Sequence, residues 1–372
     1  VNSYAGGTTV KGGILQIASD ANLGAAAGGL ALAGATLHAT GDIASARAVS
    51  LGAGNNRLDV DAARTLALNG AVSGAGSLRT IGAGSLRLGA ANAYAGGTFV
   101  DAGTLLTDVT GALGGGAASV ASGATLQLGG GFDAGTTAIG NQGMVRFQGK
   151  ASAGTSTITN AAGGVLAFAD DASATKATVL NQAGAQVRID QASAGVNVGA
   201  LGGAGDVLLG AKALTTGALN SSTTVSGTIS GAGGSLVKVG SGTLELSGAN
   251  TYTGGTTVAA GTLAVNNASG SATGTGAVQV QGGATLAGNG SVAGAVSIAK
   301  GGVLSAGNAG VGTLTLGGLN LAEGSVLNYD LGQANTAGGA LNDRVQVNGN
   351  LQLDGTLNVA QSKGGVFGAG IY

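Results

Sequence analysis

The 372-residue chain contains no cysteine, no proline and no tryptophan, and it has a single histidine. The absence of cysteine excludes disulfide bonds and thiolate metal sites. Because proline would remove a ladder hydrogen bond from any strand with neighbours on both sides, its absence is compatible with a chain made largely of such strands. The sequence also lacks sustained helical periodicity and any run of 18 strongly apolar residues. Neither long helices nor a membrane-spanning helix is therefore predicted.

Charged and aromatic residues are scarce, at 8% and 3% of the chain, and the net charge is −1. The lysines and arginines are scattered, so no run is dense enough to follow a phosphate backbone, and nucleic acid is not an expected partner. Glycine, in contrast, is abundant, with 78 residues. Glycine permits the positive φ angles of tight turns. Together with a hydrophobic content of 44%, this composition differs from that of disordered chains, which are poor in hydrophobic residues.

Three near-copies of one motif, N-x-Y-x-G-G-T-x-V-x-x-G-x-L, begin at Asn2, Asn92 and Asn250. A unit that recurs in this way buries its apolar face only by stacking on neighbouring units. We single out twelve positions as the structural repeat signature: Asn2, Tyr4, Gly6, Gly7, Asn92, Tyr94, Gly96, Gly97, Asn250, Tyr252, Gly254 and Gly255.

A shorter period, of about 20 residues, is clearest in the middle of the chain. It appears as apolar-x-apolar triplets that begin at Leu126, Val145, Leu166, Val187 and Val207. Such alternation predicts a strand with one buried face, so these residues should stack in the interior at successive coils. The residues between them should face solvent: Gln127, Arg146 and Arg188.

Short strands at a fixed spacing also occur in propellers and sandwiches. Propeller blades need about 40 residues per repeat and usually carry aromatic signatures, which this chain lacks. We therefore predict an all-β fold, a single parallel β-helix (β-solenoid) with roughly 17 coils of about 21 residues stacked about 4.8 Å apart. The densest large-apolar alternation lies between Val345 and Val359. From this we predict that the C-terminal coils form the most stable core, with Leu353 inside it.

The repeat motif resembles the passenger-associated transport repeat of bacterial autotransporters, and more broadly the autotransporter-associated β-helix repeat. Copies lie near residues 2–17, 92–107 and 250–265. A second resemblance, over residues 324–359, is to the last passenger coils before the membrane anchor. We accordingly predict a β-helix stalk over 1–323 and C-terminal passenger coils over 324–372. A membrane β-barrel is expected downstream, and both ends of the sequence look cut.

This resemblance implies a right-handed β-helix from a Gram-negative autotransporter, secreted by the type V route and anchored at the bacterial cell surface through the outer-membrane barrel. We accordingly predict an adhesin-like role in attachment or aggregation, with C-terminal coils that support secretion and templated folding. The family also includes passengers with enzymatic modules, so the prediction of neither enzymatic activity nor a cofactor rests on the residues discussed below. Expected partners are a host-surface protein or glycan, a neighbouring bacterial cell, and the chain's own barrel.

Two other functions stay open. The chain could be a structural stalk that presents an N-terminal module, which an unbroken solenoid would favour, whereas a long insertion between coils would favour adhesion through loops. It could also be a carbohydrate-active β-helix enzyme that uses surface aspartates, which a groove lined by several aspartates would favour.

The residues that such chemistry would need are few. His38 is the only base available to a Ser-His-Asp triad, but no nucleophile motif accompanies it, and alternation places it outward. Asp59 and Asp61 are two residues apart, and the Asp170–Asp171 pair lies beside Ser173. Glycoside hydrolysis needs two carboxyl groups at a defined separation, one with a raised pKa, and the sequence shows no third partner. We interpret them as exposed charges or turn acceptors.

Two glycine-rich segments and the repeat tyrosines complete the candidates. Residues 202–207 are close to a calcium-binding nonapeptide, but Asp206 comes one position early and the segment occurs once. Lys150 lacks the spacing of a phosphate loop. Tyr4, Tyr94 and Tyr252 could stack on sugar rings, but we interpret each as packing over a coil corner with its hydroxyl reaching backbone or water. No catalytic, metal or cofactor residue is therefore predicted.

Overall fold

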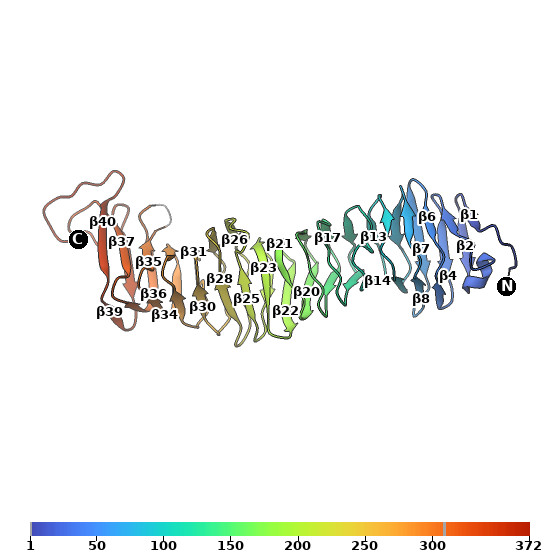
Figure 1. The fold of residues 1–372 in the computed structure, drawn as a ribbon. Helices are drawn as coiled ribbons and strands as arrows, with labels where there is room; N and C mark the ends of the chain where they lie inside the picture. The colour runs from blue at the N-terminus through green and yellow to red at the C-terminus, as the bar shows by residue number, and fades with distance from the viewer. Residues whose placement is uncertain (1, 308–309) are drawn as a thin grey trace. The chain divides into compact units, whose positions relative to one another are not determined.

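The structure is a computed structural model that describes residues 2–307 and 310–372. Its described residues are built of short strands, together with one 3-10 turn, η1 (Asp20–Leu23), and no α-helix. None of its helices is long and apolar enough to cross a membrane, within the described residues. The chain divides into two compact units, Val1–Ser193 and Ala194–Tyr372. Within each unit the strands lie one behind another in chain order (Figure 1).

The first unit has three parallel sheets, which we call faces A, B and C. Face A consists of β1 (Thr8–Val10), β3 (Leu30–Leu32), β6 (Val49–Leu51), β9 (Val72–Gly74) and β12 (Ala93–Tyr94). Face B consists of β2 (Ile14–Ile17), β4 (Thr36–Ala39), β7 (Asn55–Val60), β10 (Ser77–Thr80), β13 (Thr98–Val100), β15 (Ala118–Val120), β17 (Ile139–Asn141), β19 (Thr157–Asn160) and β21 (Ala174–Asn181). Face C consists of β5 (Ile43–Ser45), β8 (Thr65–Leu68), β11 (Ser85–Leu88), β14 (Thr104–Thr107), β16 (Thr125–Leu128), β18 (Met144–Phe147), β20 (Val165–Asp170) and β22 (Gln186–Ala192).

The second unit has two long parallel sheets, faces D and E, and one short pair of strands. Face D consists of β23 (Gly195–Gly202), β25 (Ala213–Thr216), β28 (Ser235–Lys238), β30 (Thr256–Val258), β32 (Val278–Val280), β34 (Ser291–Ile298), β36 (Thr313–Leu321), β38 (Arg344–Val347) and β39 (Leu351–Leu353). Face E consists of β26 (Thr223–Val225), β29 (Thr243–Leu246), β31 (Gly261–Val265), β33 (Ala284–Gly288), β35 (Val303–Ala306), β37 (Val326–Leu331) and β40 (Thr356–Gln361). The short pair is β24 (Asp206–Leu208) and β27 (Ile229–Ser230).

The prediction of a parallel β-solenoid is confirmed, with about 15 turns in the described residues instead of roughly 17. The difference arises because some turns are longer than the period suggests. Leu327 pairs with Leu357, 30 residues later (327 to 357), because the segment between β37 and β38 forms a long connection.

The register also follows the sequence pattern. Leu126 pairs with Val145, Val145 with Leu166 and Leu166 with Val187, and each is fully buried. Val207, in the second unit, is also buried. The alternating residues between them face outward, as the side-chain period of a strand requires. This part of the sequence prediction is therefore confirmed.

The interior of the first unit is not entirely apolar. Asn141, Asn160 and Asn181 occupy the same inward position on successive strands of face B and are buried. The Nδ2 atom of Asn141 donates to Asn160 Oδ1 at 2.7 Å, and that of Asn160 donates to Asn181 Oδ1 at 2.8 Å. Because each buried amide has a partner one coil away, this ladder fixes the stacking register without an unsatisfied polar group.

The prediction that Leu353 lies inside a C-terminal core is wrong. Leu351, Leu353, Leu357 and Val359 are 47–62% exposed. Strands β39 and β40 each pair on one side only among the described residues, so their inward side chains lack the second neighbouring coil that closes a solenoid interior. The alternation correctly marks one face of these strands, but Leu353 is not part of a closed core.

Candidate functional site

The repeat asparagines connect three successive coils. Asn92 Oδ1 accepts a hydrogen bond from the backbone N–H of Val72 at 2.7 Å, and its Nδ2 donates to the carbonyl of Ala112 at 2.6 Å. These partners lie 20 residues before and 20 residues after Asn92. Asn250 makes the equivalent bonds to Ile229 N and Ala272 O. The asparagine of the repeat therefore holds the coil on either side in register.

Two of the three repeat tyrosines are buried and offer no surface for a sugar ring to stack on. Tyr94 and Tyr252 are 0% exposed, and their hydroxyls lie 2.6 Å from Thr98 Oγ1 and Thr256 Oγ1. Burial raises the pKa of both hydroxyls well above the usual value, so they stay neutral. Rings buried to this degree cannot stack on an external sugar. Tyr4 makes the same hydroxyl contact, at 2.7 Å to Thr8, but is 42% exposed.

The hydroxyl partner is thus the threonine of the same repeat, four residues after the tyrosine. Both positions belong to the repeat motif, but the hydrogen bond between them was not predicted from the sequence. The signal was available, because tyrosine and threonine recur together at a fixed spacing in all three copies. A buried tyrosine hydroxyl needs a hydrogen-bond partner, and the threonine is the polar side chain that the motif supplies.

The paired glycines of the repeat are required by close packing of coils. Gly97 has a φ of 85°, and a Cβ atom there would lie 2.7 Å from the carbonyl oxygen of Ala117. Gly255 has a φ of 93° and the equivalent contact, 2.8 Å, with Ala277. A side chain at either position would need both an unfavourable backbone conformation and a displacement of the following coil.

A buried lysine lies in the coil before the third repeat. Lys238 is 1% exposed, and its Nζ atom donates to the carbonyls of Val239 at 2.8 Å, Gly240 at 2.8 Å and Ala260 at 3.1 Å. Burial lowers its pKa. The three acceptors occupy all three of its donors, so this group caps a turn and is not free for chemistry.

His38 lies on face B, and its Nε2 atom is 2.8 Å from Asp61 Oδ1. Asp59 is its register partner on the next strand. The hydrogen bond with Asp61, and the charges of Asp61 and Asp59, raise the pKa of the imidazole. Among the hydrogen bonds of the described residues none joins His38 to a serine or threonine hydroxyl, so no catalytic triad is assembled.

This pair makes folding stability pH-dependent in a known direction. The folded pKa of His38 lies above its ordinary value of 6.5, so its contribution is complete below about pH 6.5 and is lost as the pH rises through the folded pKa. We expect the unfolding free energy of wild type, relative to His38→Gln, to fall as the pH rises from about 6.5 through the folded pKa of His38. Urea titrations at several pH values measure this difference. A difference that does not change with pH would contradict the assignment.

The other acidic candidates cap turns. Asp170 has a φ of 53°, and its Oδ2 atom accepts from the backbone N–H of Gly149 at 2.8 Å. Asp206 Oδ1 accepts from Thr228 N at 3.0 Å. No group of three or more His, Cys, Asp or Glu that could hold a metal ion occurs in the described part of the chain. Lys150 is exposed, and no phosphate loop forms around it.

A shallow groove of about 310 Å³ lies beside Ser173. It is lined by Asp133, Gly135, Ser152, Gly154, Thr155, Ser173, Thr175 and Lys176. It contains one carboxylate, and Asp133 Oδ1 accepts from the backbone N–H of Gly135. Neither Asp170 nor Asp171 lines it. The arrangement thus lacks the facing carboxyl pair of a glycoside hydrolase.

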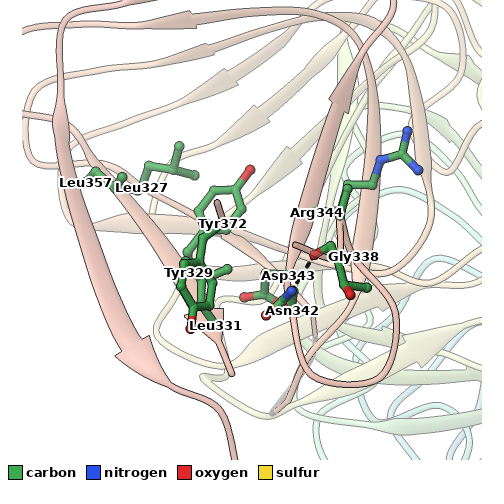
Figure 2. A pocket seen from close by; sticks show the side chains of 11 residues that line it. Leu327, Tyr329, Leu331, Gly338, Asn342, Asp343, Arg344, Leu357 and Tyr372 are labelled. Atoms are coloured by element: carbon green, nitrogen blue, oxygen red, sulfur yellow. Dashed lines mark hydrogen bonds between the residues drawn. The ribbon is translucent and has the colours of Figure 1, made fainter. Parts of the chain in front are cut away.

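A second cavity, of about 350 Å³, lies near the C-terminus, where apolar side chains of β37 face the segment that leads into β38 (Figure 2). Asp343 is 5% exposed and accepts backbone N–H bonds from Gly312 and Asp330, each at 2.8 Å. Burial raises its pKa despite these bonds. Because both carboxylate oxygens are occupied in holding the backbone, Asp343 orders the connection between β37 and β38.

Five of the seven arginines in the first unit pair with an aspartate within 4 Å: Arg47–Asp20, Arg64–Asp42, Arg79–Asp101, Arg87–Asp108 and Arg188–Asp190. Four of these pairs join different coils, and the fifth lies within β22. Arg47 is the buried one, with its side chain 1% exposed. This pattern was not predicted from the sequence, because the two residues of each of the first four pairs lie 21 to 27 residues apart.

Comparison with known proteins agrees with this architecture. The family model of the passenger-associated transport repeat matches residues 1–17, 78–106 and 236–265. A stretch of 72 residues is 58% identical to the adhesin BmaC autotransporter of Brucella suis biovar 1 (strain 1330). That stretch covers 19% of this chain and 2% of BmaC, so the chain spans only a small part of that relative's length. The repeats, the parallel solenoid and this similarity confirm the resemblance drawn from the sequence: the chain is a parallel β-solenoid that carries passenger-associated transport repeats, and it is similar over part of its length to the passenger of an autotransporter.

Proposed function

We propose that this chain is an adhesive part of a surface-displayed autotransporter passenger, and that it binds through the outer faces of its solenoid rather than in a cleft. The observation that carries the proposal is the 58% identity to part of a protein named as an adhesin. The faces suit this role, because successive strands present outward side chains in regular columns along the sheet, as on face C. Repeat proteins generally bind through such extended surfaces.

The repeats support a second part of the proposal. The second and third repeats join coils through the hydrogen bonds of their asparagine, a buried tyrosine and a glycine turn, so these coils stack on one another in register. We infer that the C-terminal coils support secretion by providing a folded end onto which further coils stack, at the outer membrane of a Gram-negative cell. Partners would be a host-surface protein or glycan, or a neighbouring bacterial cell.

One observation favours a stalk instead. The connections between successive strands of each unit have at most 12 residues in the described part of the chain, the longest being residues 18–29, 266–277 and 332–343. No long insertion between coils offers a binding loop there. A stalk that merely holds another module away from the cell would have this form, and it would bind nothing itself.

Beads coated with the full chain test the two functions. We expect these beads to remain on cultured mammalian cells after washing, and beads coated with albumin to be removed. Heat-unfolded chain on beads is the matched control for non-specific adsorption. Equal retention of native and albumin-coated beads would contradict adhesion and favour the stalk.

A further inference from the structure

Arg146 differs from the paired arginines of the first unit. It lies on β18 with its side chain on the outer side of face C, half-buried. Its Nε atom is shielded from solvent and has no hydrogen-bond partner, and no ion pair or hydrogen bond involves its other nitrogens among the described residues. A shielded donor without an acceptor destabilises the folded chain. Such a cost suggests a position that is completed by something outside the chain.

The neighbours of Arg146 form a column along face C. Gln127 precedes it on β16, Ala167 follows on β20, and Arg188 comes next on β22. Strands of a parallel sheet are about 4.8 Å apart, so Arg146 and Arg188 are separated by roughly 10 Å. Between them lies Ala167, which carries only a methyl group, and we call this interval between the two arginines the notch.

Arg188 is held in place at one side of this notch. Its Nε and Nη2 atoms donate to the two carboxylate oxygens of Asp190 at 3.1 and 2.9 Å, which raises the pKa of Arg188 and lowers that of Asp190. This bidentate pair fixes the guanidinium through Nε and Nη2 and does not use Nη1. The column therefore presents one fixed and one unpaired guanidinium around a small residue.

The surroundings favour an extended ligand over a small ion. Neither the groove nor the cavity described above is lined by a residue of this column. A free anion would be held there by half-exposed contacts that contribute little singly. Further along the same column lie Leu106 and Arg87, so a chain lying along face C would meet arginines on three strands. Several weak contacts made by one polymer chain together raise the affinity of that chain for the surface. Met144 and Val165 flank Arg146 with apolar surface on the neighbouring column.

We propose that the outer side of face C, centred on the notch formed by Arg146, Ala167 and Arg188, binds a linear acidic polysaccharide through its sulfate or carboxylate groups. Arg146 and Nη1 of Arg188 donate to one anionic group in the notch. This rests on the proposed adhesive function and gives the chemistry of the surface that it needs.

Biolayer interferometry with immobilised heparin and hyaluronan tests the proposal on the full chain. Heparin offers sulfate and carboxylate groups, and hyaluronan offers carboxylates alone. We expect binding to heparin that weakens with salt. Arg146→Gln should reduce the affinity for heparin about tenfold, the effect of one charge-assisted hydrogen bond. The slope of log affinity against log salt concentration should also become shallower by about one, because one counterion fewer is released on binding.

Two further variants make the test specific. Arg57→Gln removes the other unpaired arginine of the first unit, which is exposed on face B, and should leave affinity unchanged. Ala167→Glu places a carboxylate in the notch and should weaken binding at least as much as Arg146→Gln. Circular dichroism and thermal melting confirm that all variants fold. Binding to heparin alone assigns the notch to sulfate, and binding to both polymers shows that a carboxylate suffices.

The proposal is overturned if neither polymer binds at low salt, or if Arg57→Gln and Arg146→Gln weaken binding equally. If coated beads still attach to cells in the first case, the adhesive function stands and only the acidic polysaccharide is excluded. If the beads fail as well, the proposed function itself falls.

Discussion

Replacing Arg47 with methionine is expected to lower the unfolding free energy of the first unit by about 3–5 kcal/mol, as for other buried ion pairs that lose one partner. The Arg47 guanidinium makes a bidentate pair with Asp20, at 2.9 and 3.0 Å, and donates to carbonyls of the loop that follows η1. Methionine replaces the volume but none of the donors. Several buried carbonyls then lose their donor, and Asp20, whose side chain is 27% exposed, loses its ion-pair partner.

The measurement is urea unfolding, with hydrogen exchange at residues 18–30 to locate the loss. Arg87→Met is the matched control, because Arg87 also pairs with an aspartate of a neighbouring coil but is 39% exposed. Exposed pairs contribute about 0–1 kcal/mol. Equal losses for the two variants would show that burial of Arg47 is not what gives the pair its effect.

Asp20 gives this pair a pH dependence. Burial alone would raise the pKa of Asp20. The hydrogen bonds from Arg47 and Ser45 outweigh this effect, so the pKa of Asp20 in the folded chain lies below its ordinary value of 3.8. The contribution of a carboxylate with a lowered folded pKa is complete above the unfolded value and is lost as the pH falls through the folded one. The difference between wild type and Arg47→Met should therefore shrink below about pH 4.

The parts of the fold that the sequence predicts are those with a short period. Alternation at Leu126 and Val145 shows which side of a strand is inward, and the recurrence of that pattern gives the stacking. The same signal cannot show whether a further coil covers an inward side chain. Leu353 has the right alternation and is nevertheless 62% exposed. Burial in a solenoid depends on both neighbouring coils, which one strand's pattern does not contain.

The candidate site was less predictable because its partners are one coil apart. Arg47 and Asp20 are 27 residues apart, and Arg146 is distinguished only by having no such partner. The sequence around Arg47 and Arg146 does not indicate these environments, because a charged side chain on a strand is ordinarily exposed to solvent. The contact between Tyr94 and Thr98 differs, because both belong to the repeat and the pairing follows from burial of the ring.

Tyr94→Ala is expected to destabilise the first unit by about 3–5 kcal/mol, the usual cost of deleting a fully buried aromatic side chain. Tyr94 is 0% exposed, and its removal leaves a cavity between coils and deprives Thr98 of its hydroxyl partner. Tyr94→Phe keeps the ring and should cost about 1 kcal/mol, since Thr98 still donates to the carbonyl of Leu113 at 2.9 Å. Urea unfolding with the same probes measures both.

Tyr4→Ala is the matched control from another copy of the same repeat. Tyr4 has the same hydroxyl contact with its threonine but is 42% exposed, so the substitution should cost about 1 kcal/mol or less. If burial determines the role of the repeat tyrosine, the alanine substitutions at Tyr94 and Tyr252 will resemble each other and differ from that at Tyr4. Equal effects at Tyr4 and Tyr94 would instead mean that the tyrosine stabilises its own turn through the threonine contact. The repeat would then act within one coil rather than between coils.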